Sequence, residues 1–131
     1  MSKNTYAKIK NVGLEPKEPK NILNIENLEH RKSIINNFKI VVIVYYTNWC
    51  RPCKEIKEQY SIMYKEYQEI CSFIIFVKED MEKNIGEYIV TPDGVPCFHF
   101  YLNGIIQKDL SVIGGDLNQV QQNINFILDN Y

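Results

Sequence analysis

The segment Asn48–Glu55, NWCRPCKE, places two cysteines three positions apart beside the only tryptophan of the chain. It follows Lys39–Tyr46 (KIVVIVYY), an unbroken run of β-branched and aromatic residues that predicts a strand covered on both faces. Apolar residues then recur at three- and four-residue steps, which predicts a helix over residues 50–70. The cysteine pair therefore lies where a buried strand passes into a long helix, as a redox couple, half of a metal site or two packed thiols.

The composition describes an ordinary soluble globular domain. The chain has 131 residues, 45% of them hydrophobic and 24% charged, which is enough for one domain with a sizeable core. The formal net charge is −1 and basic residues form no run, so we expect no nucleic-acid partner. We also expect no membrane association and a cytoplasmic location, because the sequence has neither an apolar stretch of about 18 residues nor a secretory signal.

The pattern along the chain predicts a single α/β domain over residues 21–131. Residues 1–20 contain prolines among charges and are predicted to form a flexible polar extension. A βαβ crossover followed by an Asn103-Gly104 hairpin predicts a mixed sheet with helices on both faces. The predicted strands are 21–25, 39–46, 72–77, 97–102 and 105–113, and the predicted helices are 26–38, 50–70 and 116–130, with a loop over 78–96.

A cysteine at the start of a helix is well placed for chemistry. Unpaired amides and the positive end of the helix dipole favour the thiolate of Cys50, and such positions lower a cysteine pKa from ~8.5 to roughly 3.5–7.5. Cys53 follows one turn later on the same side, so it can close a disulfide with Cys50 and release an adduct. Pro52 suits the first helical turn, while Arg51 and Lys54 add positive charge. We interpret the pair as a redox couple.

The segment WCRPCK after a buried strand resembles the active site of the thioredoxin family, normally WCGPCK. The segment 94–96 (GVP) before CFHFYL resembles the family's cis-proline segment and the strand after it, and Asn103-Gly104 resembles its hairpin. The segment 112–117 (VIGGDL) resembles the glycine turn before its last helix. The similarity spans residues 22–131, so we expect the thioredoxin fold.

The resemblance implies dithiol–disulfide exchange, in which Cys50 attacks a substrate disulfide and Cys53 resolves the mixed disulfide. It implies a cis Val95-Pro96 bond, substrate hydrogen bonds from the Val95 backbone, and an apolar rim formed by Trp49 and Pro96. The expected partners are proteins with disulfides and an electron donor like thioredoxin reductase. The redox-active Cys50–Cys53 disulfide would need no metal and no organic cofactor, and we expect a monomer.

The sequence departs from the family pattern at one catalytic feature. The family usually has a buried Asp six residues before the first cysteine, and Val44 stands at that position. We place Phe76 at the position of the companion Lys on the next strand. The chain would then lack the Asp/Lys pair that helps to deprotonate the resolving cysteine, so we expect Cys53 to resolve more slowly.

Alternatives stay open for the function of the protein and for the role of Cys97. The protein could form or isomerise disulfides, or it could be a non-enzymatic binding module with the thioredoxin fold. Cys97 could be a third thiol near the couple or, with His99 and the pair, a zinc ligand. Structural zinc sites normally use paired short-range ligands, so a small buried residue is the favoured interpretation of Cys97. Cys71 is expected to be an inert, packed thiol.

Overall fold

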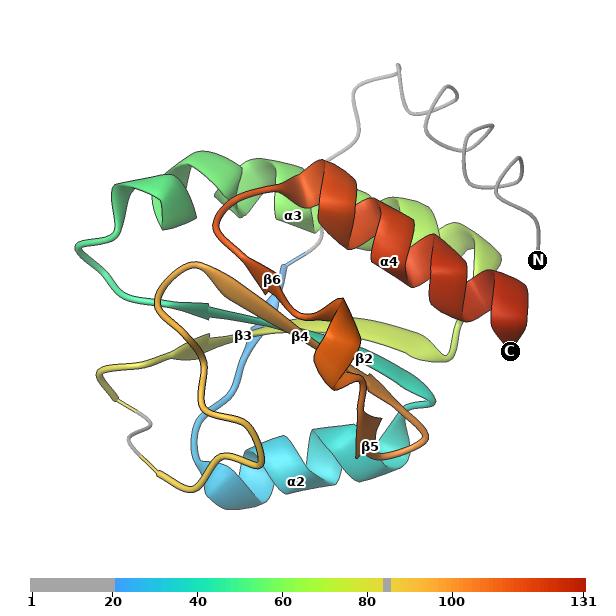
Figure 1. The fold of residues 1–131 in the computed structure, drawn as a ribbon, viewed down its shortest axis with the longest axis horizontal. Coiled ribbons are helices and arrows are strands. Elements are labelled where there is room, and N and C mark those ends of the chain that lie inside the picture. Colours follow the sequence, from blue (N-terminus) through green and yellow to red (C-terminus); the bar gives the residue numbers. More distant parts are fainter. Residues whose placement is uncertain (1–20, 84–85) are drawn as a thin grey trace.

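Strand β2, which leads into the cysteine pair, lies at the centre of a mixed sheet with helices on both faces (Figure 1). The computed structural model describes residues 21–83 and 86–131, so the predicted extension at 1–20 lies outside the described residues. The strands are β1 (Leu23–Asn24), β2 (Ile40–Tyr46), β3 (Ile74–Asp80), β4 (Cys97–Leu102), β5 (Ile105–Ile106) and β6 (Val112–Ile113). The helices are α2 (Leu28–Asn37), α3 (Arg51–Ile70) and α4 (Leu117–Asn130), with a 3₁₀ turn, η1, at Lys108–Leu110.

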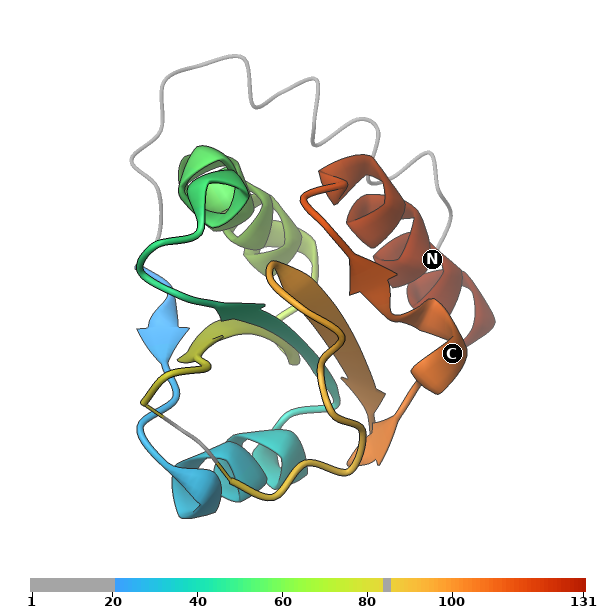
Figure 2. The same ribbon diagram turned by 60° about the vertical axis from the view of Figure 1, so that its left-hand side comes forward.

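The sheet has the strand order β1-β3-β2-β4-β5, and β6 also pairs with β4. Strands β1, β3 and β2 are parallel, whereas β4 runs antiparallel to β2. Helix α2 covers one face, and α3 and α4 cover the other (Figure 2). Alternate residues of β2 enter two separate cores, with Val42 and Val44 on the α3 side and Val41 and Ile43 on the α2 side. The predicted α/β architecture, a mixed sheet with helices on both faces, is confirmed.

Side-chain caps define where two of the helices begin. The Asn27 side chain accepts a hydrogen bond from the His30 amide at 2.8 Å, and Asp116 accepts one from the Gln119 amide at 3.1 Å. Each satisfies one of the unpaired amides of a first helical turn. All three predicted helices are present, and each begins and ends within a few residues of its expected bounds.

The predicted strand 105–113 is wrong, because it is interrupted by η1. β5 pairs Ile106 with Tyr101, whereas β6 pairs Val112 with Phe98. The two pairs are three residues apart on β4 but six residues apart on the segment that contains β5 and β6. Three extra residues of that segment therefore bulge out of the ladder. The Asn123 side chain of α4 donates to the Leu110 carbonyl at 2.6 Å and holds the bulge in place.

Strand β3 continues to Asp80, three residues beyond the predicted end. The residues there are polar, a pattern that predicts a loop, yet Glu79 is fully buried. Its carboxylate accepts two hydrogen bonds at 2.8 Å from the buried Arg31 guanidinium of α2. A buried charge needs such a partner, and this partner lies 48 residues away in the chain, so local sequence does not reveal it.

Candidate active site

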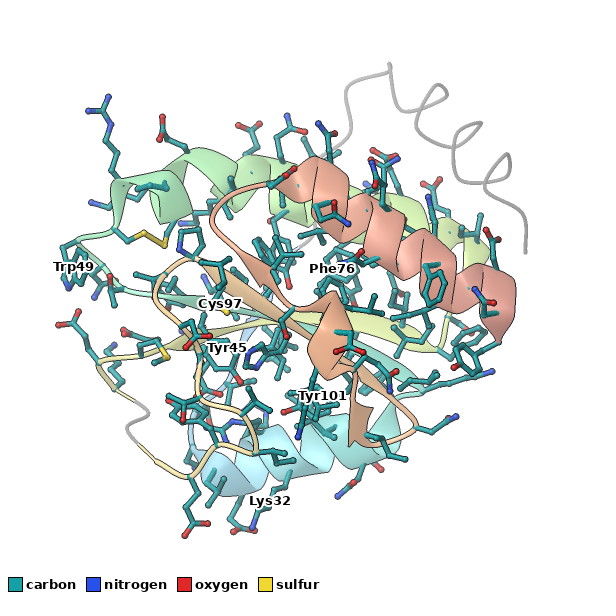
Figure 3. The ribbon with its side chains drawn as sticks, in the orientation of Figure 1. Lys32, Tyr45, Trp49, Phe76, Cys97 and Tyr101 are labelled. Carbon is teal, nitrogen blue, oxygen red and sulfur yellow. A yellow bond between two sulfur atoms is a disulfide. The ribbon has the colours of Figure 1, made fainter. Side chains whose placement is uncertain are left out.

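The two cysteines form a disulfide at the start of α3 (Figure 3). The S–S distance is 2.23 Å and the two Cα atoms are 5.3 Å apart. Cys50 is the N-cap residue, and its Sγ accepts a hydrogen bond from the Cys53 amide at 3.2 Å. Helical geometry places Cys53 one turn further on and on the same side, which is why this spacing brings the sulfurs into contact.

Exposure differs sharply around the pair. Cys50 is 3% exposed and Cys53 9%, whereas Trp49 is 70% exposed. Arg51, Pro52 and Lys54 are also exposed, and Pro52 occupies the first turn of α3. The structure thus places the predicted charged and rim residues of the WCRPCK segment on the surface around a covered disulfide. Tryptophan, with its large and partly polar ring, is a residue type enriched at protein interfaces.

The Val95-Pro96 peptide bond is cis, and Pro96 precedes β4. Cys97 pairs with Tyr45 near the end of β2. Val95 and Pro96 therefore lie at the same end of the sheet as the segment that leads from β2 to Cys50. Pro96 is buried and Val95 is half-buried. The Pro96 carbonyl accepts a hydrogen bond from the Gly114 amide at 2.7 Å, and Gly114 has a φ of 93°, which favours glycine.

The glycine turn also contacts the first turns of α3. A Cβ atom on Gly115 would lie 3.1 Å from Ile56 Cγ2, so this position leaves room for the active-site helix. Three segments that resemble the family pattern therefore meet at one end of the sheet: the cysteine pair, the GVP segment and the Gly-Gly turn.

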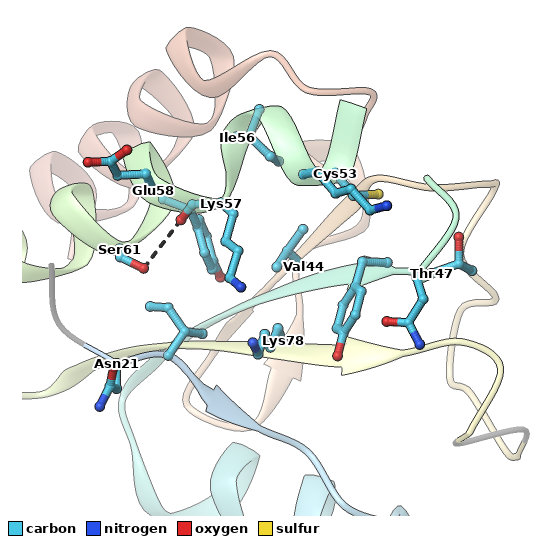
Figure 4. A pocket seen from close by; sticks show the side chains of 14 residues that line it. Asn21, Val44, Thr47, Cys53, Ile56, Lys57, Glu58, Ser61 and Lys78 are labelled. Atoms are coloured by element: carbon cyan, nitrogen blue, oxygen red, sulfur yellow. Dashed lines mark hydrogen bonds between the residues drawn. The ribbon is translucent and has the colours of Figure 1, made fainter. Parts of the chain in front are cut away.

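A cleft of about 720 Å³ opens beside Cys53 on the α3 side of the sheet (Figure 4). Val44 lines it, and the register of β2 and β3 pairs Val44 with Lys78, which lines the same cleft. The carboxylate of the Asp/Lys pair is absent, but the assignment of Phe76 to the lysine position is wrong. Phe76 pairs with Val42 and lies in the core, while Lys78 stands beside Val44. The sequence does not show that Lys78 lies beside Val44, because the 20-residue helix α3 separates the two strands and only their pairing fixes the register.

Cys97 and His99 lie on the other side of the sheet from the disulfide. Cys97 packs in the apolar cluster under α2 with Val41, Ile43 and Tyr45. The His99 ring meets the Tyr45 ring edge-on, with 5.0 Å between the centroids. Cys97 is therefore not a third thiol beside the couple, and the four suggested zinc ligands do not come together. Among residues 21–83 and 86–131, His, Cys, Asp and Glu form no cluster of three or more suited to a metal ion.

The two free cysteines are poor nucleophiles. Cys71 and Cys97 are 4% and 1% exposed, and burial raises the pKa of each thiol. A thiol that is buried and protonated reacts slowly. Cys71, at the end of α3, thus has the packing expected from the sequence.

The buried ion pair between Arg31 and Glu79 also holds the segment that leads to Pro96. Arg31 donates to the Glu87 carbonyl at 2.5 Å, and its Cζ atom lies 4.5 Å from the centre of the Tyr88 ring. One guanidinium therefore ties α2, β3 and the loop before β4 together. Sequence reasoning missed this group, since no local pattern marks Arg31 as buried.

A disulfide at the first turn of a helix, with a cis-proline segment at the same end of a mixed sheet, defines a class of thiol–disulfide oxidoreductases. The family model named Thioredoxin matches residues 21–125. The chain belongs to the thioredoxin family.

Relatives and solved structures agree with this assignment. The chain is 29% identical over 110 residues to the thioredoxin of Ictalurus punctatus, covering 79% of this chain and 96% of the relative. It is 35% identical over 71 residues to that of Geodia cydonium, covering 54% and 64% respectively, so the match spans less than two thirds of that relative. The fold matches mitochondrial thioredoxin 3 of Saccharomyces cerevisiae in its oxidised form, with a TM-score of 0.67, 22% identity and coverage of 92% and 96%. Together with the bonded cysteine pair, these relatives identify the general chemistry as thiol–disulfide exchange with a redox-active disulfide.

Proposed function

We propose that the protein reduces disulfides in other proteins, with Cys50 as the nucleophile and Cys53 as the resolving thiol. The observation that carries the proposal is the Cys50–Cys53 disulfide at the N-terminus of α3, where Cys50 Sγ accepts a hydrogen bond from the Cys53 amide. That amide and the helix dipole favour a thiolate on reduced Cys50. The thiolate attacks one sulfur of a substrate disulfide, and the other substrate sulfur leaves as a thiolate.

The second step regenerates the disulfide. Cys53 attacks the Cys50 sulfur of the mixed disulfide, the Cys50–Cys53 bond forms, and the remaining substrate sulfur leaves with the electron pair. The substrate docks against Trp49 and the Val95-Pro96 segment, whose Val95 backbone offers hydrogen bonds to an extended peptide. A reductase then returns two electrons to the disulfide. We place this cycle in the cytoplasm, with a monomeric protein and no metal or organic cofactor. Among the described residues, no helix has the length and apolar character needed to cross a membrane.

Insulin reduction tests the proposal. With dithiothreitol as the electron source, the wild-type protein is expected to accelerate the precipitation of insulin chains, and Cys50→Ser is expected to abolish the effect. Cys97→Ser is the matched control, because this cysteine lies on the other face of the sheet. An inactive wild-type protein that nonetheless binds a partner through Trp49 would identify a binding module instead.

A further inference from the structure

The cleft beside Cys53 holds more positive than negative charge. Lys54 and Lys57 line it from α3 and Lys78 lines it from β3, whereas Glu58 is the one carboxylate among the described lining residues. In Figure 4 the Lys57 side chain extends toward β3, where Lys78 lies, and the carboxylate of Glu58 points away from Cys53. None of the three lysines forms an ion pair with another described residue. Positive charge in the cleft is therefore left without compensation.

Lys78 shows this imbalance most clearly. Its side chain is half-buried, and its pKa is lowered, first by burial and then by the charge of Lys57. Its neighbour on β2 is Val44, which offers no negative charge. The Lys78 ammonium instead lies over the Tyr46 ring, 5.7 Å from its centre. Because a partly buried charge is costly without a partner of opposite sign, an anion bound in the cleft would stabilise this arrangement.

The rest of the lining suits an organic anion better than a bare inorganic ion. Ile22, Val44 and Ile56 give the cleft an apolar wall. Thr47 also lines it, and although this side chain is only 5% exposed, its hydroxyl has no hydrogen-bond partner among the described residues. An apolar wall with a few polar groups, in a volume of about 300–1,000 Å³, is typical of a small-molecule site. The volume of about 720 Å³ lies within that range.

We propose that the cleft beside Cys53 binds a small organic anion, with its carboxylate, sulfonate or phosphate group between Lys57 and Lys78 and its apolar part against Val44 and Ile56. The two ammonium groups donate charge-assisted hydrogen bonds to the anion. The negative charge of the ligand also removes the repulsion between the two lysines. Binding is reversible, and no covalent bond forms or breaks.

This site is separate from the surface proposed to hold protein substrates. That surface is formed by Trp49 and the Val95-Pro96 segment, and none of these three residues lines the cleft. An anion in the cleft therefore leaves the substrate surface free, and the inference does not depend on disulfide reduction.

A fluorescent anion tests the proposal. Anilinonaphthalene sulfonate combines one sulfonate group with an apolar ring system, and its fluorescence rises when it leaves water. Titration into the oxidised wild-type protein at low salt should give a saturable curve that fits one site. Phenylnaphthylamine, which has the same rings without the sulfonate, should bind about tenfold more weakly, because it cannot accept hydrogen bonds from the ammonium groups.

Variants of the lysines and of Val44 locate the site. Lys78→Met should weaken binding of the dye by about tenfold, whereas Lys78→Arg keeps the charge and should keep the affinity. Val44→Asp places a carboxylate beside Lys78 and should weaken binding at least as much, because it occupies the ammonium and repels the sulfonate. Lys57→Met should have a smaller effect, since this lysine is exposed and more strongly screened by salt.

A remote variant and a folding check complete the test. Lys32→Met removes an exposed lysine from α2 on the opposite side of the sheet and should bind the dye like wild type (Figure 3). Circular dichroism shows whether each variant is folded, and if Val44→Asp is not, the comparison of Lys78→Met with Lys78→Arg decides. Equal affinity of the dye for wild type and Lys78→Met would overturn the proposal. Equal affinity of the wild-type protein for the dye and its neutral analogue would also overturn it, because the dye would then bind through its rings alone.

Discussion

The buried pair Arg31–Glu79 provides a quantitative test of the packing described above. Both guanidinium–carboxylate hydrogen bonds are 2.8 Å long, and the side chains are only 6% and 0% exposed. Removal of one partner leaves the other charge buried without an opposite charge beside it, which typically destabilises by about 3–5 kcal/mol. We therefore expect Arg31→Met and Glu79→Leu each to lower the free energy of unfolding by about 4 kcal/mol and the melting temperature by roughly 10–20 °C.

The double variant should be more stable than either single variant. With both charges replaced by apolar side chains of similar size, the loss of a buried pair is often neutral. What remains lost are the Arg31 hydrogen bond to the Glu87 carbonyl, worth about 1–2 kcal/mol, and the Arg31 contact with the Tyr88 ring, worth roughly 0.5–2 kcal/mol. Urea unfolding followed by circular dichroism measures all three variants, with Lys32→Met as the exposed control on the same helix, expected within about 0.5 kcal/mol of wild type.

Two results would contradict a strong interaction between Arg31 and Glu79. Single variants that lose less than about 1 kcal/mol would mean that the pair behaves like an exposed salt bridge. A double variant whose loss equals the sum of the two single losses would mean that the two residues do not interact.

Three further predictions concern Gly114 in the turn before α4, the buried His99 and the free Cys97. Gly114→Ala should destabilise by about 1–2 kcal/mol in urea unfolding, because its φ of 93° disfavours a Cβ atom; Gly86→Ala, at a position without positive φ, should not. Burial, opposed by Asp93 and reinforced by Arg31, lowers the pKa of His99, so the unfolded chain binds its proton more readily. Stability should thus fall as pH drops below about 6.5, and a flatter pH profile in His99→Leu would confirm the source. Cys97→Ser should keep wild-type insulin reduction, and a large loss of turnover would contradict its place on the far face of the sheet.

The local features of the active site were predictable because nearby residues determine them. A β-branched run, a cysteine N-cap with Pro52 in the first turn, and two thiols one turn apart all act within about 15 residues. The structure agrees with this local prediction, because Cys50 caps α3 and forms a disulfide with Cys53.

Features that depend on partners distant in sequence were not predictable. The end of β3 depends on Arg31 of α2, and the bulge after β5 depends on the pairing of β4 with two separate strands. Lys78 was missed for the same reason, since its place beside Val44 follows from the register of parallel strands. The sequence indicates which residues are buried in a strand, but pairing decides which residues become neighbours.

The proposed disulfide exchange requires that the start of α3 hold reduced Cys50 as a thiolate. The most direct measurement is the rate of Cys50 alkylation by iodoacetamide as a function of pH in the reduced protein, with mass spectrometry to identify the modified residue. The expected midpoint lies below the ~8.5 of free cysteine, within roughly 3.5–7.5. A midpoint at or above the value of free cysteine would contradict it.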